Sequence, residues 1–240
     1  MLNKTAENAS YLQLVDVNQI KDFKTYLARA KSLDAQASVR LITRGMSVGA
    51  YVCALAPETL IDTTPTILGL RALNIASAQT LDTTVEISAV LDRLARIDQQ
   101  KNYLFIPPVV TTASWSGQLP PFSDWAKIGR TTVGELKKIA LDGMNAVDSA
   151  LPANPGHAVL ATVRSRIWSS PMPWEAIENQ EYRYTPENYT LPSGIAFAAE
   201  VLGFLPPVAH MPVYIYHSEG WIRLSCPMGH VLCKKSASSE

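Results

Sequence analysis

The sequence predicts an α+β protein, because segments with strand periodicity cluster in each half of the chain and helical segments follow one another between them. The chain has 240 residues, of which 47% are hydrophobic. A chain of this length buries roughly 70–75% of the surface that it exposes when unfolded, so it needs neither a metal nor a disulfide to fold. We expect an N-terminal half of helices and antiparallel sheet, a connecting arm, and a helical region that ends in a three-strand meander.

The N-terminal α+β sub-domain is expected over residues 1–106. Residues 17–33 carry apolar side chains at helical spacing, and Asn18 can cap the start of this helix. Residues 38–55 form two strand-like runs around a glycine-containing turn, which predicts a hairpin. The remaining segments expected here are strands over 66–76, 83–87 and 101–106, and a helix over 88–97.

Residues 107–128 are expected to form a Pro/Trp-rich connecting arm. The segment holds two Pro-Pro pairs together with Trp115 and Trp125. Proline cannot donate to a strand ladder, and it drives the preceding residue toward extended conformations. We therefore expect an irregular segment between the two halves.

The C-terminal sub-domain is expected over residues 129–240. A helix capped by Thr131 or Thr132 is followed by a second helix after Asn154, with Val159 among the residues that face inward. Glycine-containing turns then separate the last strands, which is typical of a meander. The strands expected in it are 212–217, 221–226 and 231–235.

The charge balance disfavours a nucleic-acid partner. Lys and Arg total 21, Asp and Glu total 21, and the isoelectric point is about 6.9. Affinity for phosphate polymers comes mainly from excess positive charge. We expect an unknown protein or small-molecule partner instead, and the sequence leaves a homo-oligomer open.

The chain is expected in the cytoplasm, with no membrane contact. Its first ten residues lack the apolar stretch of a signal peptide, and no run approaches the roughly 18 apolar residues of a membrane-spanning helix. The three cysteines are a sparse, odd set, for which reduced thiols are the simplest interpretation.

Residues 45–49 match the pattern G-x-S-x-G, which carries the nucleophile of serine hydrolases when a strand enters the turn and a helix leaves it. The string also resembles the nucleophile turn of patatin-type lipases. The chain shows no glycine-rich oxyanion loop upstream and no alternating βα units, and a hairpin turn fits the same residues. A serine hydrolase with Ser47 as nucleophile is therefore kept as the alternative function. Its partners would come from Asp142, His157, His210 and His217.

Cys226, His230 and Cys233 are residue types that bind zinc. Their spacing fits no familiar zinc motif, and strand alternation is expected to place the two cysteines on opposite faces. The sequence has no phosphate-binding loop and no dinucleotide fingerprint. We expect no metal and no cofactor, and no catalytic residue is assigned.

The five tryptophans flank prolines, glycines or turns. Tryptophan buries a large area and keeps one hydrogen-bond donor, which suits a recognition groove as well as a core. We expect a concave surface formed by the arm and the loop after Trp174, in which arginines can bind an anion. The alternative is that the tryptophans hold irregular loops onto the sheets. The candidate binding residues are Trp115, Trp125, Arg130, Arg164, Trp168 and Trp174.

Several stretches that together run through most of the chain resemble a family of conserved hypothetical proteins from actinobacteria. They are Arg44-Gly45 with Gly49, Trp115-x-Gly117-x-Leu119-Pro120-Pro121, Ile167-Trp168-Ser169-x-Pro171, Leu202-Gly203-Phe204-Leu205 and Trp221-x-Arg223-Leu224. The resemblance implies a soluble cytoplasmic protein and assigns no activity, cofactor or site; in that family the position of Ser47 is not a fixed nucleophile. The leading hypothesis is a protein of unknown function that acts as a binding or interaction module rather than as an enzyme.

Overall fold

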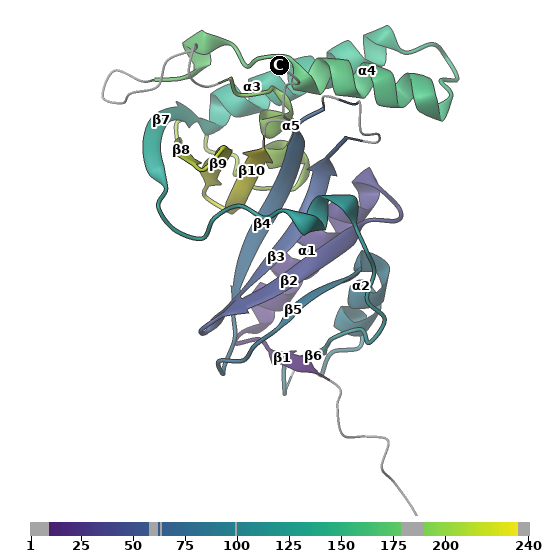
Figure 1. The fold of residues 1–240 in the computed structure, drawn as a ribbon, viewed down its shortest axis with the longest axis vertical. Coiled ribbons are helices and arrows are strands. Elements are labelled where there is room, and N and C mark those ends of the chain that lie inside the picture. The colour runs from purple at the N-terminus through teal and green to yellow at the C-terminus, as the bar shows by residue number, and fades with distance from the viewer. Residues whose placement is uncertain (1–9, 58–61, 63, 99, 179–189, 235–240) are drawn as a thin grey trace, which may run out of the picture. The chain divides into compact units, whose positions relative to one another are not determined.

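The computed structural model describes residues 10–57, 62, 64–98, 100–178 and 190–234. Contacts divide the chain into two compact units: unit 1 comprises residues 1–52 and 71–117, and unit 2 comprises residues 53–70 and 118–240. Figure 1 shows helices and strands in both of them. The predicted α+β class, with a meander at the C-terminal end, is confirmed.

In the described part of the chain, eight strands follow the order β5-β2-β3-β4-β10-β9-β8-β7, and β1 pairs separately with β6. The strands are Tyr11–Gln13 (β1), Ser38–Arg44 (β2), Ser47–Leu55 (β3), Thr66–Asn74 (β4), Asp82–Glu86 (β5), Tyr103–Phe105 (β6), Ala126–Thr132 (β7), Pro212–Ser218 (β8), Trp221–Cys226 (β9) and Gly229–Lys234 (β10). The helices are Val17–Leu33 (α1), Ile87–Ala95 (α2), Val133–Ala150 (α3), His157–Ser169 (α4) and Gly194–Val201 (α5), with 3-10 turns at Ser114–Gly117 (η1) and Trp174–Ala176 (η2).

The core of unit 1 forms because α1 presents an apolar stripe. Phe23 and Leu27 of α1 are fully buried, as are Val39 of β2 and Val52 of β3. The Tyr26 hydroxyl is buried with them and donates a hydrogen bond of 3.2 Å to the carbonyl of Ala50. This bond satisfies a polar group that burial would otherwise leave unpaired.

The hairpin and the first helix of unit 1 are confirmed. Strands β2 and β3 pair in antiparallel register from Arg44 opposite Ser47, and Gly45 turns the chain at φ +56°. Helix α1 begins at Val17 as expected, but its cap is Asp16 rather than Asn18. The Asp16 carboxylate accepts a hydrogen bond of 2.6 Å from the backbone N–H of Asn18. A side chain directly before the first helical residue can reach the free amides of the first turn.

The first part of the Pro/Trp-rich arm lies along β5, the outermost strand at one end of the order. The N–H of Thr111 donates to the carbonyl of Thr84 in β5 at 2.9 Å. Farther along, the Arg40 guanidinium of β2 donates to the carbonyl of Ser116. These contacts hold the first part of the arm, residues 107–117, within unit 1.

Strand β7 in unit 2 was not predicted. It begins at Ala126, inside the segment expected to be irregular, and pairs with β8 across a register shift between Lys127 and Gly129. Its far side pairs with the Glu178 backbone, where Arg130 and Glu178 exchange two N–H to carbonyl bonds of 3.0 and 2.8 Å. The prolines and tryptophans before Ala126 favoured an irregular segment, so the strand was not recognised from the sequence.

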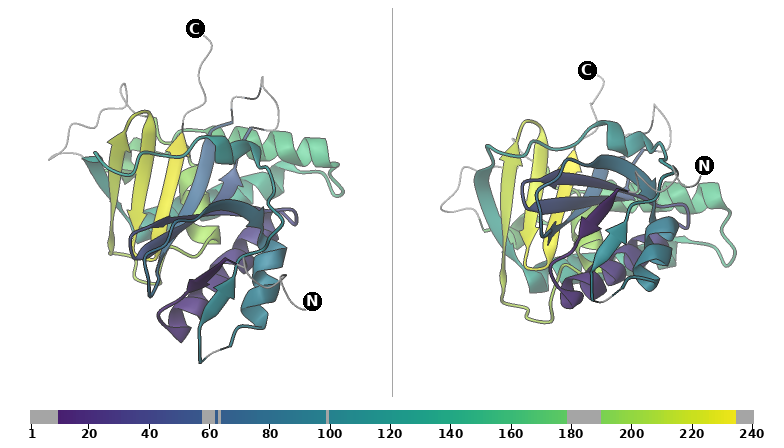
Figure 2. Two further views of the ribbon diagram at one scale, coloured as in Figure 1. Left: turned by 60° about the horizontal axis from the view of Figure 1, so that its bottom comes forward. Right: turned by 90° about the horizontal axis from the view of Figure 1, so that it is seen from below.

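The sheet of unit 2 has two chemically different faces. Figure 2 shows its strands side by side, with helices against one face. Val213, Ile215, Leu224 and Val231 point to that face and are fully buried. Helix α5 packs against β10 and is buried along most of its length, which explains its nearly continuous apolar sequence.

The helices of unit 2 meet around Trp168, which is 1% exposed and lies at the end of α4. Its ring stacks on Phe197 of α5 with centroids 4.4 Å apart. A Cβ added to Gly143 of α3 would lie 2.2 Å from the Trp168 ring, so only glycine fits there. Helix α4 otherwise differs from expectation: it begins at His157, and Val159, which was expected to face inward, is 46% exposed.

We expect Gly143→Ala to destabilise the protein by about 1–3 kcal/mol, because the new methyl group overlaps a buried ring that cannot move freely. Urea unfolding followed by circular dichroism measures the change. Gly117→Ala is the matched control, since nothing lies within 4 Å of its Cβ position. Equal stability of the two variants would contradict the packing described around Trp168.

Candidate functional site

The face of the unit 2 sheet that points away from the helices carries cations stacked on aromatic rings. Alternation places Tyr214 and Tyr216 of β8 on this face, and the pairing of Tyr216 with Arg223 adds β9. The Lys127 ammonium lies 3.7 Å from the Tyr214 ring centroid, and the Lys234 ammonium lies 5.7 Å from that of Trp221. We call this surface the cation–aromatic face; it consists of Trp125, Lys127, Arg130, Tyr214, Tyr216, Trp221, Arg223, His230 and Lys234.

Arg223 lies at the middle of the cation–aromatic face. Its guanidinium carbon is 4.6 Å from the ring centroid of Trp125 and 4.6 Å from that of Tyr216. Contacts of this kind contribute about 0.5–2 kcal/mol each, more when water is excluded. The Trp125 indole is fixed in turn, because its Nε1 donates to the carbonyl of Pro121 at 3.0 Å.

No carboxylate within the described residues neutralises Arg223, and its buried Nε has no acceptor there. Burial lowers the pKa of Arg223, and Tyr216 opposes this in part. The side chain remains charged at neutral pH, since an arginine is never deprotonated in proteins under such conditions. The face therefore holds a cation whose desolvation is offset by rings rather than by an anion.

His230 of β10 stands next to Arg223 on the same face. It pairs with Ser225 in β9, and its buried Nδ1 has no hydrogen-bond partner among the described residues. Burial, with a smaller contribution from the charge of Arg223, lowers the pKa of His230 from 6.5 to about 4. The imidazole is thus neutral at pH 7 and can donate one N–H.

Two other cations of this face are already engaged. Arg130 of β7 forms an ion pair with Glu178, in which Nε and Nη2 both contact the carboxylate oxygen Oε2, at 2.7 Å and 2.6 Å. The pair is largely exposed, so it adds little to stability. Lys234 donates to the side-chain oxygen of Gln118.

The structure brings only part of the predicted binding set together. Trp125 and Arg130 lie on the cation–aromatic face. Arg164 and Trp168 instead approach the Phe197 ring, where Trp168 serves the core. Trp115 is a half-buried residue of unit 1, in η1, and the side chain of Trp174 lies outside the described residues.

Sequence reasoning missed Lys127, Tyr214, Tyr216, Arg223 and His230. The available signal was the alternation of ring and cation positions in the meander, as in Tyr214-x-Tyr216 and Trp221-x-Arg223. Residue types alone do not show which of them are neighbours across strands, because that requires the register.

The cysteines of the meander share a face, which corrects the expectation that they lie on opposite faces. Cys233 pairs with Ile222, and Ile222 lies on the same side of β9 as Cys226. Both thiols are buried, and burial raises the pKa of Cys226 to about 12. The described residues contain no group of three or more His, Cys, Asp or Glu side chains that could hold a metal.

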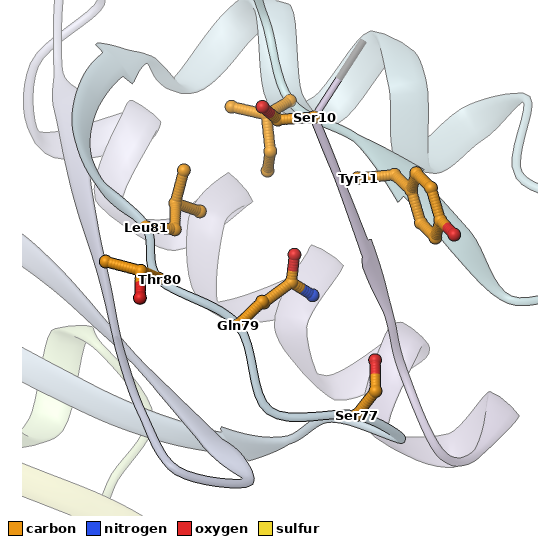
Figure 3. Close-up of a pocket in the computed structure, with 7 residues that line it drawn as sticks. Ser10, Tyr11, Ser77, Gln79, Thr80 and Leu81 are labelled. Atoms are coloured by element: carbon orange, nitrogen blue, oxygen red, sulfur yellow. The ribbon is translucent and has the colours of Figure 1, made fainter. Parts of the chain in front are cut away.

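Unit 1 contains a small hollow beside β1, shown in Figure 3. Its volume is about 230 Å³, and hydroxyl and amide groups predominate among its polar side chains. The Tyr11 ring points away from Leu81 and packs 4.7 Å from Tyr103. Among the described residues that line the hollow there is no carboxylate, amine, guanidinium or imidazole. The lining residues are Ser10, Tyr11, Ser77, Gln79, Thr80, Leu81 and Ile106.

The environment of Ser47 is that of a strand residue. Ser47 is the first residue of β3, and a strand rather than a helix follows it. The turn therefore lacks the strand–turn–helix geometry that exposes a nucleophilic serine. The structure supports the hairpin interpretation over the serine hydrolase.

We expect the purified chain to remain unlabelled by a fluorophosphonate probe, which reacts with activated serines whatever their substrate. Mass spectrometry of the intact protein measures the labelling. Adduct formation that disappears in Ser47→Ala would contradict the hairpin argument.

We expect His230 to make folding stability depend on pH. Its pKa is about 4 in the folded protein and 6.5 when unperturbed, so between these values the unfolded chain binds the proton better. Stability then falls as the pH is lowered from about 6.5 to about 4. His230→Gln removes this part of the dependence, as measured by urea unfolding across that range. His210→Gln, at an exposed position, is the control and should leave the dependence unchanged.

Among the described helices, none is long and apolar enough to cross a membrane. Comparison with curated proteins gives no match. Residues 7–117 match the family model of a domain of unknown function, DUF8010, and residues 120–238 match that of a second one, DUF8185.

Solved structures with a similar fold include two DNA polymerase III β subunits. The putative subunit from Eubacterium rectale ATCC 33656 has a TM-score of 0.54 at 6% identity, covering 96% of this chain and 66% of that one. The subunit from Borrelia burgdorferi, solved in complex with a natural product, has a TM-score of 0.51 at 10% identity, covering 93% and 64%. This chain thus spans slightly less than two thirds of the length of these proteins. Matches to two domains of unknown function, DUF8010 and then DUF8185, cover almost the whole chain, and its fold is similar to that of DNA polymerase III β subunits.

Proposed function

We propose that this protein is an interaction module, and that the cation–aromatic face of unit 2 binds a partner protein. The observation that carries the proposal is the position of Arg223 over the rings of Trp125 and Tyr216, without a carboxylate partner among the described residues. A folded protein gains little by retaining a desolvated cation at its surface, whereas a binding surface uses one.

The composition of the face supports this role. Tyrosine, tryptophan and arginine are enriched in protein interfaces and carry a large share of the binding energy in them. Here Tyr214, Tyr216 and Arg223 lie on adjacent paired strands, Trp125 directly precedes β7, and all four residues are partly exposed. Strand pairing and the hydrogen bond of the Trp125 indole fix these side chains, so little ordering is needed upon binding.

The fold comparison supports the same role. Both similar proteins named above are subunits of DNA polymerase III, and one of them was solved in complex with a natural product. A subunit works through contacts with other proteins. We extend this general property, and no particular partner, to the present chain.

The proposal includes a cytoplasmic location. Cys226 and Cys233 are buried at positions where oxidation would disturb packing. A reducing compartment suits such a set.

A peptide library displayed on phage tests the proposed function, with the full chain as the immobilised target. We expect enriched peptides whose affinity falls about tenfold or more in Arg223→Gln or Trp125→Ala, as for central interface residues. Fluorescence anisotropy with synthetic copies of the peptides measures the loss, and circular dichroism confirms that the variants are folded.

The matched control is Arg166→Gln, which removes an exposed arginine of α4 in the same unit. It should leave affinity unchanged. Peptides that bind the wild type and all three variants equally well would overturn the assignment of the partner site to this face, as would a library that yields no binder.

A further inference from the structure

The two Nη groups of the Arg223 guanidinium are available to a ligand. The guanidinium carbon lies over both the Trp125 and the Tyr216 rings, 4.6 Å from each ring centroid. The five N–H donors of an arginine lie in the plane of the guanidinium and point outward at its edges. Nε is buried without an acceptor, whereas the two Nη groups have neither a partner among the described residues nor complete burial.

His230 adds a second polar group at the same place. It lies on β10 opposite Ser225, two positions along β9 from Arg223, and its Nδ1 also lacks a partner within the described residues. The strand register therefore places the two side chains diagonally across neighbouring strands on one face of the sheet. Together they offer one full positive charge and one neutral imidazole, with no anion between them in the described part of the chain.

The charges around Arg223 favour an acidic ligand. Lys127 and Lys234 lie on the same face, over the Tyr214 and Trp221 rings. Of the described acidic side chains in this part of unit 2, Glu178 is paired with Arg130, Asp124 accepts a hydrogen bond from Ser123, and Glu219 lies in the turn between β8 and β9.

We propose that Arg223 and His230 form a carboxylate-binding site, which recognises an Asp or Glu side chain in an extended acidic segment of the partner protein. Two N–H groups of a guanidinium can donate parallel hydrogen bonds to the two oxygens of one carboxylate, and the rings of Trp125 and Tyr216 orient the guanidinium of Arg223. The inference rests on the proposed function, because the carboxylate is taken to belong to a partner that binds the cation–aromatic face.

A peptide carboxylate suits the site better than a nucleic acid. Binding of a phosphate backbone requires many cationic contacts, and the formal net charge of this chain is zero. One guanidinium flanked by two rings is instead suited to a single planar anion with apolar neighbours.

Nuclear magnetic resonance with acetate as the minimal carboxylate probe tests the site directly in the full chain. We expect saturable shifts of the Arg223 Nη and His230 imidazole signals, with chloride at equal ionic strength producing none. Arg223→Lys keeps the positive charge but removes the planar pair of N–H donors, so it should weaken acetate binding at least several-fold. Arg166→Gln is the control and should bind acetate like the wild type.

Display peptides provide the second arm of the test. The enriched peptides should contain Asp or Glu, and replacing that residue by Asn or Gln should lower affinity about tenfold in the wild type but not in Arg223→Gln. If the Arg223 and His230 signals shift linearly with acetate concentration, without saturation and no more than the Arg166 signals do, the carboxylate site is overturned.

The outcomes separate this inference from the proposed function. Peptides that need Trp125 and Arg223 but contain no acidic residue would overturn the carboxylate site and leave the interaction role standing. Saturable acetate binding without any enriched peptide would overturn the interaction role and leave an anion site. A twelve-nucleotide single strand that binds more tightly than the acidic peptides, and loses binding in Arg223→Gln, would assign the site to nucleic acid instead.

Discussion

The register of the β8–β9–β10 meander is the constraint on which the core and the candidate site of unit 2 both depend. Leu224 is paired with Ile215 and Val231, and all three are buried beneath the helices. The neighbouring position, Arg223, is paired with Tyr216 and emerges on the other face. A slip of one residue would exchange the two faces, so the packing energy of the core also fixes the arrangement of cations and rings.

That dependence explains how much could be predicted from the sequence. The hairpin of β2 and β3, the helix that begins at Val17, and the meander follow from local periodicity, and all three are present. Strand β1 has only three residues, which is too short for a local pattern, and β7 adjoins a proline-rich stretch that favours irregular structure.

The site was less accessible to sequence reasoning for a physical reason. Trp125 and Trp168 have the same side chain, yet one covers Arg223 and the other fills the space left by Gly143. Residue type states what a side chain can do, whereas its neighbours across strands and helices determine what it does. Arg223 itself stands in an ordinary alternating strand, and only the pairing with Tyr216 distinguishes it.

The segments beside β5 and β7 have a consequence for how the protein meets other molecules. Those strands end the order of the eight-stranded sheet, and each hydrogen-bonds to another part of the chain, through Thr111 and through Glu178. Backbone groups used in this way cannot template a further strand, which is the usual route by which sheets polymerise. Thr84 in β5 and Arg130 in β7 are thus positions at which the two outer strands are protected against pairing with another chain.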